Sequence, residues 1–193
     1  MSLTVIGIIG SAGHGKDAVC EIALSQNEDA KRIALADKLK EEVAAHFHEF
    51  PEFQLRFDRQ GRISYVVPRE EITPWKEAYR RKIYQLWGTE GRREIDSRWW
   101  LKEWAVKATA AVVAGFKTIL VPDLRFRNEV DFVQNELGGV VYGVDRGAYR
   151  REDTDYNHAS ERFIPELLGR ADLVIANQGD LTDLESAVMS ALN

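Results

Sequence analysis

The sequence predicts a three-layer α/β fold in which a five-stranded, mostly parallel sheet carries helices on both faces. Two observations predict it. Short β-branched runs alternate with helical segments along the chain, and 193 residues suffice for one well-packed core but not for two ordinary domains and a linker. We therefore expect one domain over residues 1–193, in which any additional material is an insertion.

Five apolar segments have the length and composition of buried strands. They cover residues 3–9, 32–35, 118–121, 140–144 and 173–176. Because helical segments separate them, they are expected to pair mostly in parallel, through crossover connections.

The helices begin and end at recognisable residues. Thr73-Pro74 starts one with the proline in its first turn, and Gly115 ends the long helix before strand 118–121. Gly88 and Gly91 are expected to interrupt the helix that Pro74 starts. The expected helices cover residues 18–25, 37–47, 73–87, 97–114, 128–136, 160–168 and 181–192.

One segment departs from the alternation of strands and helices. Residues 54–58 and 62–67 flank the tripeptide Arg-Gln-Gly and are expected to form a β-hairpin. We assign it to an insertion over about residues 49–100.

Composition excludes several classes of protein. Lys and Arg number 26 against 31 Asp and Glu, a formal charge of −5, so no stable nucleic-acid binding is expected. No apolar run reaches the roughly 18–20 residues of a bilayer span, and no export signal is recognisable, so no membrane association is expected. The lone Cys20 is typical of a reducing compartment, which favours a cytoplasmic protein.

Gly10-x-x-x-x-Gly15-Lys16 has the spacing of a phosphate-binding loop between a strand and a helix. Backbone amides of such a loop surround the phosphates, and Lys16 reaches the terminal ones. Asp17 stands where the general motif has Ser or Thr; it is either a Mg²⁺ ligand or an acid stabilised by the helix dipole. The residues expected to bind the nucleotide are Gly10, Gly13, His14, Gly15, Lys16, Asp17 and Ala18.

Charged residues follow two other strands. Asp37 follows the second strand and Asp123 the next one, at the sheet edge where open α/β folds bind ligands. Asp123 is expected to hold the metal with its water shell, and the neighbouring Arg125 and Arg127 to bind an acceptor phosphate. A helix N-cap for Asp37, and a turn with surface charges at 123–129, are the alternatives.

The arginine-rich residues 145–159, here called the lid segment, are of the kind that closes over a nucleotide and excludes water. Ser160 is expected to cap the helix that follows. Most of the tryptophans should be core residues, and one or two could stack on a base. They are Trp75, Trp87, Trp99, Trp100 and Trp104.

The ordered motifs resemble those of the phage-type deoxynucleoside monophosphate kinases, in the adenylate-kinase-like P-loop group. The motifs are the glycine loop in its Gly-Lys-Asp form, Ala36-Asp37-x-Leu39-Lys40, Leu86-x-Gly88-Thr89-Glu90-Gly91-x-Arg93-x-Ile95-Asp96, Asp123-x-Arg125-Phe126-x-Asn128-Glu129, His158-x-Ser160-Glu161 and Ala171-Asp172-x-x-Ile175-x-Asn177. The likeness spans nearly the whole chain.

This resemblance implies a P-loop NTPase fold, ATP and Mg²⁺ as phosphoryl donor, and a deoxynucleoside monophosphate as acceptor. It implies catalytic roles for Lys16, Arg125, Arg150 and Arg151, and metal binding by Asp17 and Asp123. The implied substrate-binding residues are Asp37, Lys40, Trp87, Arg93, Asp123, Arg125, Arg127 and Glu161. Ala18 departs from relatives that often have Thr there. The products would be ADP and a dNDP for DNA synthesis, in the host cytoplasm if the chain is phage-encoded, and a homodimer is allowed.

Two alternatives remain open from the sequence. A dephospho-coenzyme A kinase would share the architecture and an acid after the second strand. A nucleotide-binding regulatory protein would share the phosphate loop without catalysis. The several arginine groups favour an enzyme.

Overall fold

The computed structural model describes residues 3–49, 53–57, 63–68, 83–152, 154 and 156–192. The chain divides into two compact units, which are described separately. The core unit comprises Met1–Leu35 and Trp104–Asn193, and the second unit comprises Ala36–Glu103.

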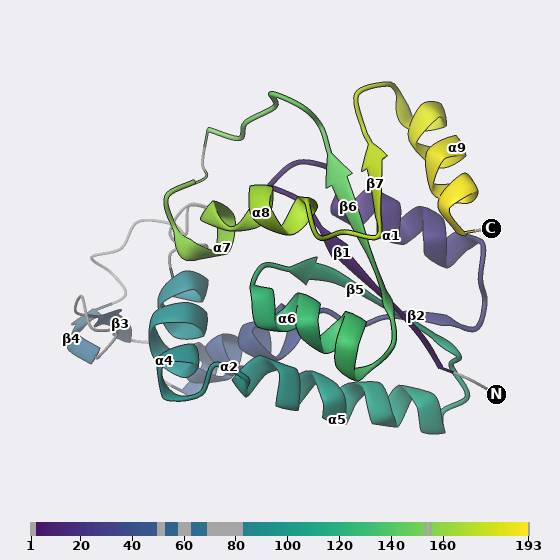
Figure 1. The fold of residues 1–193 in the computed structure, drawn as a ribbon. Coiled ribbons are helices and arrows are strands. Elements are labelled where there is room, and N and C mark those ends of the chain that lie inside the picture. Colours follow the sequence, from purple (N-terminus) through teal and green to yellow (C-terminus); the bar gives the residue numbers. More distant parts are fainter. Residues whose placement is uncertain are drawn as a thin grey trace. The chain divides into compact units, whose positions relative to one another are not determined.

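The core unit is built on a five-stranded sheet in the order β2-β5-β1-β6-β7, and every pair is parallel (Figure 1). Its strands are β1 Thr4–Ile9, β2 Ala30–Arg32, β5 Thr118–Leu124, β6 Val140–Asp145 and β7 Leu173–Ala176. The predicted fold class is confirmed. The central strand β1 pairs Ile6 with Leu120 on one side and with Val140 on the other.

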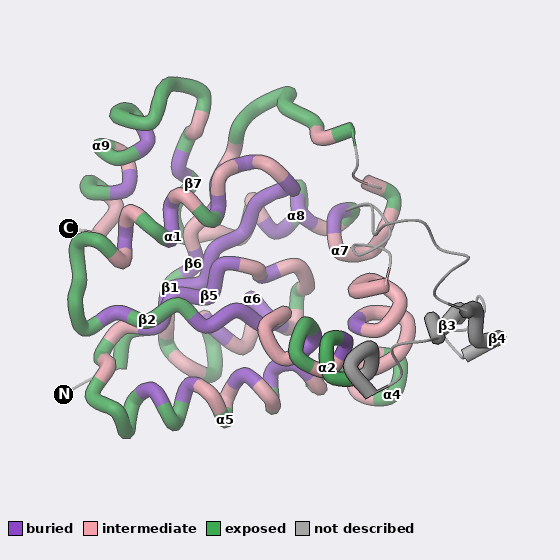
Figure 2. Tube along the Cα trace, turned by 180° about the vertical axis from the view of Figure 1, so that it is seen from behind, coloured by how far each residue is buried: buried purple, intermediate pink, exposed green. Residues whose placement is uncertain are grey.

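Alternate residues of β1 face opposite layers, because side chains along a strand point to opposite faces. Ile6 and Ile8 belong to a buried cluster with residues of α1, Lys16–Ser25, and of α9, Leu181–Leu192. Val5 instead lies beside Val133, in the π-helical turn η3, Phe132–Glu136. Figure 2 shows the resulting buried centre of the sheet.

The second strand is displaced from its predicted position. It was expected over 32–35 but spans Ala30–Arg32. Ile33 still donates its amide to Leu120, whereas the Leu35 amide donates to Oδ1 of Asp123 at 2.8 Å. Residues 33–35 are buried without being a strand, and their apolar pattern reports burial rather than pairing.

Two expected helices of the core unit are divided. The first is α-helical over Arg127–Asp131 (α6) and continues as η3. The second breaks at Phe163 into α7, Ala159–Arg162, and α8, Ile164–Leu168. Pro165 lies in the first turn of α8, and proline has no amide hydrogen with which to continue the helix before it.

The N-cap prediction for Ser160 is wrong. His158 is the N-cap of α7, and its Nδ1 accepts from the Ser160 amide at 3.2 Å. The Ser160 hydroxyl lies 2.9 Å from the same Nδ1. The imidazole therefore takes the role that the sequence assigned to the serine.

The second unit contains α2, Ala36–Glu49, and the antiparallel hairpin β3 Phe53–Phe57 and β4 Ile63–Pro68. The hairpin prediction is confirmed. The π-helix η2, Leu86–Arg92, leads into α4, Arg93–Ile95, and then α5, Trp99–Val113, which enters the core unit at Trp104. Residues 73–82 of the helix expected over 73–87 lie outside the described part of the chain.

The predicted interruption at Gly88 and Gly91 is wrong, since both lie inside η2. Gly88 allows close packing inside the second unit. A Cβ there would lie 2.9 Å from Cδ2 of Leu39, and its carbonyl accepts from the Trp100 indole at 3.0 Å. None of the helices that the structure describes is long and apolar enough to cross a membrane.

Candidate active site

The phosphate loop connects β1 to α1 and is shaped by its glycines. Gly13 and Gly15 have φ of 80° and 98°, in the left-handed region that residues with a Cβ rarely adopt. Gly15 is the N-cap of α1 and offers no side chain to its first turn. Gly10 has a different reason, because a Cβ there would lie 2.7 Å from the carbonyl oxygen of Val144. The loop thus presents backbone amides at the N terminus of a ten-residue helix.

Lys16 lies under this loop rather than in solvent. Its Nζ donates to the carbonyl oxygens of Gly10 at 2.7 Å and Ser11 at 2.8 Å. Burial, and to a smaller extent the positive charge of Arg125, lower the pKa of Lys16 from 10.5 to about 7. Three carboxylates near enough to oppose that shift belong to Glu161, Asp17 and Asp123. The structure therefore brings together five predicted site residues from three segments of the chain.

Glu161 links the phosphate loop to Arg125. One carboxylate oxygen accepts from the Ala12 amide at 3.2 Å, and the other forms an ion pair with the Arg125 guanidinium. The Glu161 side chain is 3% exposed and that of Arg125 is 22% exposed. The guanidinium also donates to the Ser160 carbonyl at 3.3 Å. The buried carboxylate holds the arginine close to the loop while leaving part of it accessible.

Glu129 is a supporting residue for which the sequence motifs predict no separate role. Its buried Oε2 accepts from the amides of Arg125 at 2.7 Å and Phe126 at 3.1 Å. The carboxylate thereby fixes the backbone that carries the arginine. Its position in the sequence could have predicted this role, because a Glu at the third position of a helix commonly accepts hydrogen bonds from the amides just before the helix.

The two expected metal ligands differ in their surroundings. Asp17 is exposed in the first turn of α1, whereas Asp123 is half-buried within β5 and accepts from the Leu35 amide. The strand expected over 118–121 continues to Leu124 and so includes Asp123. Among the described residues, no three carboxylate, imidazole or thiol side chains gather to form a metal site alone. The two carboxylates of Asp17 and Asp123 are of the kind that suits Mg²⁺, which is commonly held by one or two carboxylates together with substrate phosphates.

The start of the lid segment contacts the phosphate loop. A Cβ at Gly13 would lie 2.6 Å from Cε1 of Tyr149 and 2.9 Å from Cγ of Arg151. The Arg151 amide donates to the Tyr156 hydroxyl at 2.8 Å, and the Arg150 guanidinium lies 4.6 Å from the centre of the Tyr156 ring. Both arginines assigned to the lid are thus tied to one tyrosine.

Three residues assigned to substrate or nucleotide have other prominent contacts. Arg127 forms an ion pair with Glu166 of α8, with Nε donating to Oε1 at 2.6 Å, and the pair is largely exposed. His14 is buried, at 3% exposure, and faces the lid segment. Ala18 is half-buried on α1 and packs against the core cluster.

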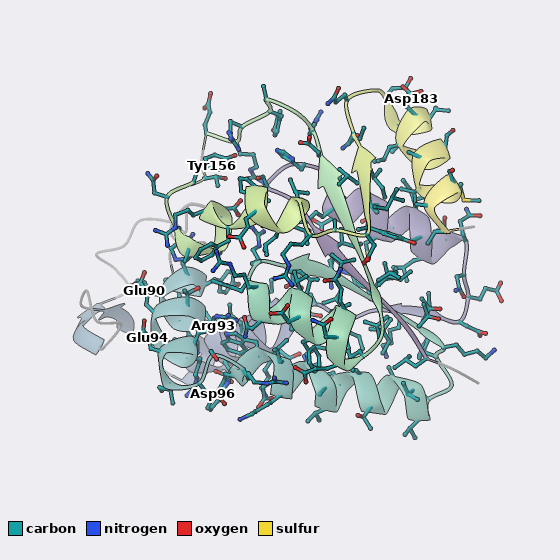
Figure 3. All side chains as sticks on the ribbon, viewed as in Figure 1. Glu90, Arg93, Glu94, Asp96, Tyr156 and Asp183 are labelled. Atoms are coloured by element: carbon teal, nitrogen blue, oxygen red, sulfur yellow. The ribbon has the colours of Figure 1, made fainter. Side chains whose placement is uncertain are left out.

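The remaining substrate-binding candidates lie in the second unit. Asp37 is in the first turn of α2 but is not its N-cap, because the helix begins at Ala36. Lys40 is exposed on the same helix. Arg93 begins α4 (Figure 3). Trp87 is half-buried on η2.

The described tryptophans differ in burial. Trp100 and Trp104 are core residues, whereas Trp87 and Trp99 are half-buried and Trp75 lies outside the described residues. A single carboxylate oxygen of Glu42 accepts from the Trp87 indole at 3.0 Å and from Arg92 Nε at 3.1 Å. The Arg92 guanidinium lies 4.6 Å from the centre of the Trp99 ring. This cluster fixes the indole of Trp87 in one orientation.

Comparisons with known proteins identify the family of this chain. A family model described as deoxynucleotide monophosphate kinase matches residues 54–188. A protein of Acanthamoeba polyphaga mimivirus, named "Putative deoxynucleotide monophosphate kinase", is 25% identical over 209 residues, covering 99% of this chain and 97% of that protein. The deoxynucleotide monophosphate kinase of Enterobacteria phage T4 is 30% identical over 113 residues, which cover 58% of this chain and 44% of the phage protein.

A solved structure shares the fold. The crystal structure of TT1252 from Thermus thermophilus matches with a TM-score of 0.55 at 18% identity, over 100% of this chain and 97% of that one. At that identity the likeness shows the fold alone. The family model, in contrast, covers more than half of the chain, from the hairpin to the last helix. The chain therefore belongs to the deoxynucleotide monophosphate kinase family and is a phosphotransferase.

Proposed function

We propose that this kinase transfers the γ-phosphate of ATP to the phosphate of a deoxynucleoside monophosphate, giving ADP and a dNDP. The observation that carries the proposal is the grouping of Arg125 and Glu161 around the phosphate loop and Lys16. One guanidinium held beside a triphosphate-binding loop by a buried carboxylate suits a reaction between two phosphorylated substrates.

The donor would bind through the loop amides and Lys16. In the structure, the Lys16 ammonium donates to two carbonyl oxygens of its own loop. Phosphate oxygens are stronger acceptors, because hydrogen bonds to ionised partners are roughly twice as strong as neutral ones. The negative charge of ATP would also raise the pKa of Lys16 and keep the side chain protonated.

Mg²⁺ would be held by Asp17 and Asp123 together with phosphate oxygens. When bound, the metal neutralises negative charge on the phosphates. Asp17 is exposed on the first turn of α1, and Asp123 is near enough to Lys16 to affect its pKa. An Asp17 that serves only the helix dipole is the alternative reading.

In the core unit, Arg125 would bind the acceptor phosphate. In the second unit, we assign Arg93 to phosphate binding, Trp87 to the base, and Asp37 and Lys40 of α2 to substrate binding. Trp87 suits stacking because Glu42 holds its indole N–H and thereby fixes the ring plane.

The reaction would need no strong general base. A nucleotide phosphate is already largely ionised near pH 7, so its oxygen attacks without losing a proton in the same step. Catalysis then depends on alignment and on neutralisation of charge by Lys16, Arg125, Arg150 and Arg151. Arg127 would contribute only if its ion pair with Glu166 opened.

We further propose that the enzyme acts in the cytoplasm, the host cytoplasm if phage-encoded, on small nucleotides and without a stable nucleic-acid partner. The formal charge of −5 supports the last point. A homodimer is compatible with this function but is not required by it. Neither dephospho-coenzyme A kinase activity nor a purely regulatory role is favoured by the family match.

The test is an initial-rate panel of dNMPs and NMPs, with ADP release as the signal and Arg125→Met as a matched variant. We expect turnover with at least one dNMP and a loss of about 100-fold or more in kcat/KM for Arg125→Met. Glu94→Gln, an exposed change on α4, should leave the rate unchanged. The proposal fails if every nucleotide is inert while dephospho-coenzyme A or another alcohol consumes ATP.

A further inference from the structure

His14 has an environment that nucleotide binding does not explain. It lies within the phosphate loop, yet its side chain is turned away from solvent and only 3% of the residue is exposed. Its ring meets the Tyr149 ring edge-on, with centroids 6.5 Å apart. The imidazole therefore contacts the lid segment across 135 positions of sequence.

Both ring nitrogens bond to the backbone of the lid segment. Nδ1 lies 3.1 Å from the Arg146 amide nitrogen, which is a donor, and so must accept. Nε2 lies 3.3 Å from the Tyr149 carbonyl oxygen, which is an acceptor, and so must donate. Only the neutral imidazole with its proton on Nε2 satisfies both bonds.

The backbone of His14 is held as firmly as its ring. Its amide donates to Ser11 at 3.1 Å, and its carbonyl oxygen accepts from the Asn177 amide side chain at 2.9 Å. That same side chain lies 2.4 Å from where a Cβ of Gly15 would be. Hydrogen bonds therefore hold both the backbone and the ring of His14, and the lid segment packs against the ring.

Charged groups surround the ring on several sides. Oδ1 of Asp145, at the end of β6, lies 3.7 Å from Nδ1. The Arg146 guanidinium packs on the Tyr149 ring at 4.4 Å and donates to the Gly13 carbonyl at 3.4 Å. Arg151 lies against Gly13, and Lys16 is buried in the same loop. A proton on Nδ1 of His14 would allow an ion pair with the Asp145 carboxylate, but Nδ1 could then no longer accept the hydrogen bond from the Arg146 amide.

We propose that His14 is a positioning residue that fixes the start of the lid segment on the phosphate loop. In this role neutral imidazole, protonated on Nε2, accepts from Arg146 and donates to Tyr149. The segment held in this way carries Arg150 and Arg151, and the role in turnover rests on the proposed use of ATP. Because Gly13 has no side chain, Tyr149 and Arg151 can lie directly on the loop.

Three variants separate the two bonds. His14→Asn keeps an acceptor near the position of Nδ1, His14→Gln keeps a donor near that of Nε2, and His14→Leu keeps neither. Asp131→Asn, which removes the charge from a half-exposed ion pair with Arg170 elsewhere in the core unit, is the control. We expect His14→Leu to raise the KM for ATP about tenfold, and the polar variants about threefold, since one or two hydrogen bonds are lost. In the His14 variants, the KM for the dNMP should stay within about twofold of the wild-type value. In Asp131→Asn, both KM values should stay within about twofold of wild type.

Two measurements do not depend on turnover. Hydrogen exchange of the Arg146 amide should become at least about tenfold faster in His14→Leu, and slower in His14→Asn than in His14→Leu. Nitrogen-15 NMR of the imidazole in the wild-type protein near pH 7.5 should find Nε2 protonated and Nδ1 not. The NMR result remains decisive even if His14→Leu fails to fold.

The inference is overturned by an imidazole protonated on Nδ1, by unchanged exchange at Arg146, or by equal losses for ATP and dNMP. A wild-type protein that is inactive with every nucleotide would remove the proposed function while leaving the exchange and NMR tests valid. An active wild type whose His14 variants match Asp131→Asn would instead remove the inference alone.

Discussion

Glu161 forms a buried ion pair with Arg125, 36 positions away in the sequence, and its second oxygen accepts from the amide of Ala12. Removing the charge from a buried pair leaves its partner uncompensated. We expect Glu161→Gln to lower the free energy of unfolding by about 1–3 kcal/mol, because Ala12 keeps an acceptor while Arg125 loses its counter-charge. Urea denaturation measures this loss.

The ion pair between Arg170 and Asp131, whose side chains are 33% and 48% exposed, is the matched control for that experiment. Exposed ion pairs contribute about 0–1 kcal/mol, so Asp131→Asn should have a much smaller effect on unfolding. Equal losses in the two variants would show that the Glu161 pair is no more important than a surface contact.

Gly10 approaches the carbonyl of Val144 so closely that an added Cβ would lie 2.7 Å from its oxygen. Because both groups belong to the backbone, neither can move aside cheaply. Gly10→Ala should therefore destabilise the protein by about 1–3 kcal/mol. In Gly169→Ala the Cβ would lie 3.3 Å from the Glu166 carbonyl, and thermal denaturation should give a change below about 1 kcal/mol. Similar losses for both substitutions would contradict the close-approach argument.

Burial lowers the pKa of Lys16 to about 7, against 10.5 for a free lysine. The unfolded chain therefore binds more protons than the folded protein between these values, and the cost to stability is greatest below pH 7 and fades towards pH 10.5. Lys16→Met removes that cost but also two hydrogen bonds. We expect it to be more stable than wild type by about 1–3 kcal/mol below pH 7.

The difference in unfolding free energy between wild type and Lys16→Met isolates this group, since other titrations cancel. It should shrink steadily as the pH rises above 7. A difference that is constant up to pH 10 would mean that Lys16 keeps its ordinary pKa in the folded protein.

Asp17 provides a direct test of metal binding. If its carboxylate holds Mg²⁺ with the nucleotide, Asp17→Asn should raise the Mg²⁺ concentration for half-maximal activity by about tenfold, because the amide is a weaker ligand. Initial rates over a Mg²⁺ titration measure it. Glu21→Gln, on an exposed position of the same helix, should leave the curve in place. An unchanged curve for Asp17→Asn would assign this acid to the helix dipole.

Glu42 should control the orientation of Trp87. Its carboxylate accepts from both the Trp87 indole and Arg92, so Glu42→Ala leaves two donors without this acceptor. We expect a loss of about 1–3 kcal/mol in stability, a shift of tryptophan fluorescence, and a rise in the KM for dNMP with that for ATP unchanged. Glu94→Ala, exposed on α4 of the same unit, is the control. If the KM for ATP alone rises, Trp87 does not serve the acceptor.

The α/β alternation, the hairpin and the phosphate loop could be predicted because each is encoded within a few adjacent residues. Glycines at 13 and 15 and the run of β-branched residues before them suffice to predict a strand, a loop and a helix. Errors arose where distant contacts replaced local ones. The Leu35 amide bonds to Asp123 instead of extending β2, and Gly88 packs on Leu39 within η2 instead of ending a helix.

The sequence by itself determined the class of fold, the glycine loop with the spacing of a phosphate-binding loop and the family to which the chain is similar, since these depend on local spacing and on residue order. Only the tertiary structure decided which side chains meet. Glu161 reaches Ala12 across 149 positions, and His14 contacts the lid segment across 135. Hydrogen bonds over such separations depend on how the sheet brings its strand ends together, and no short window of sequence contains that information.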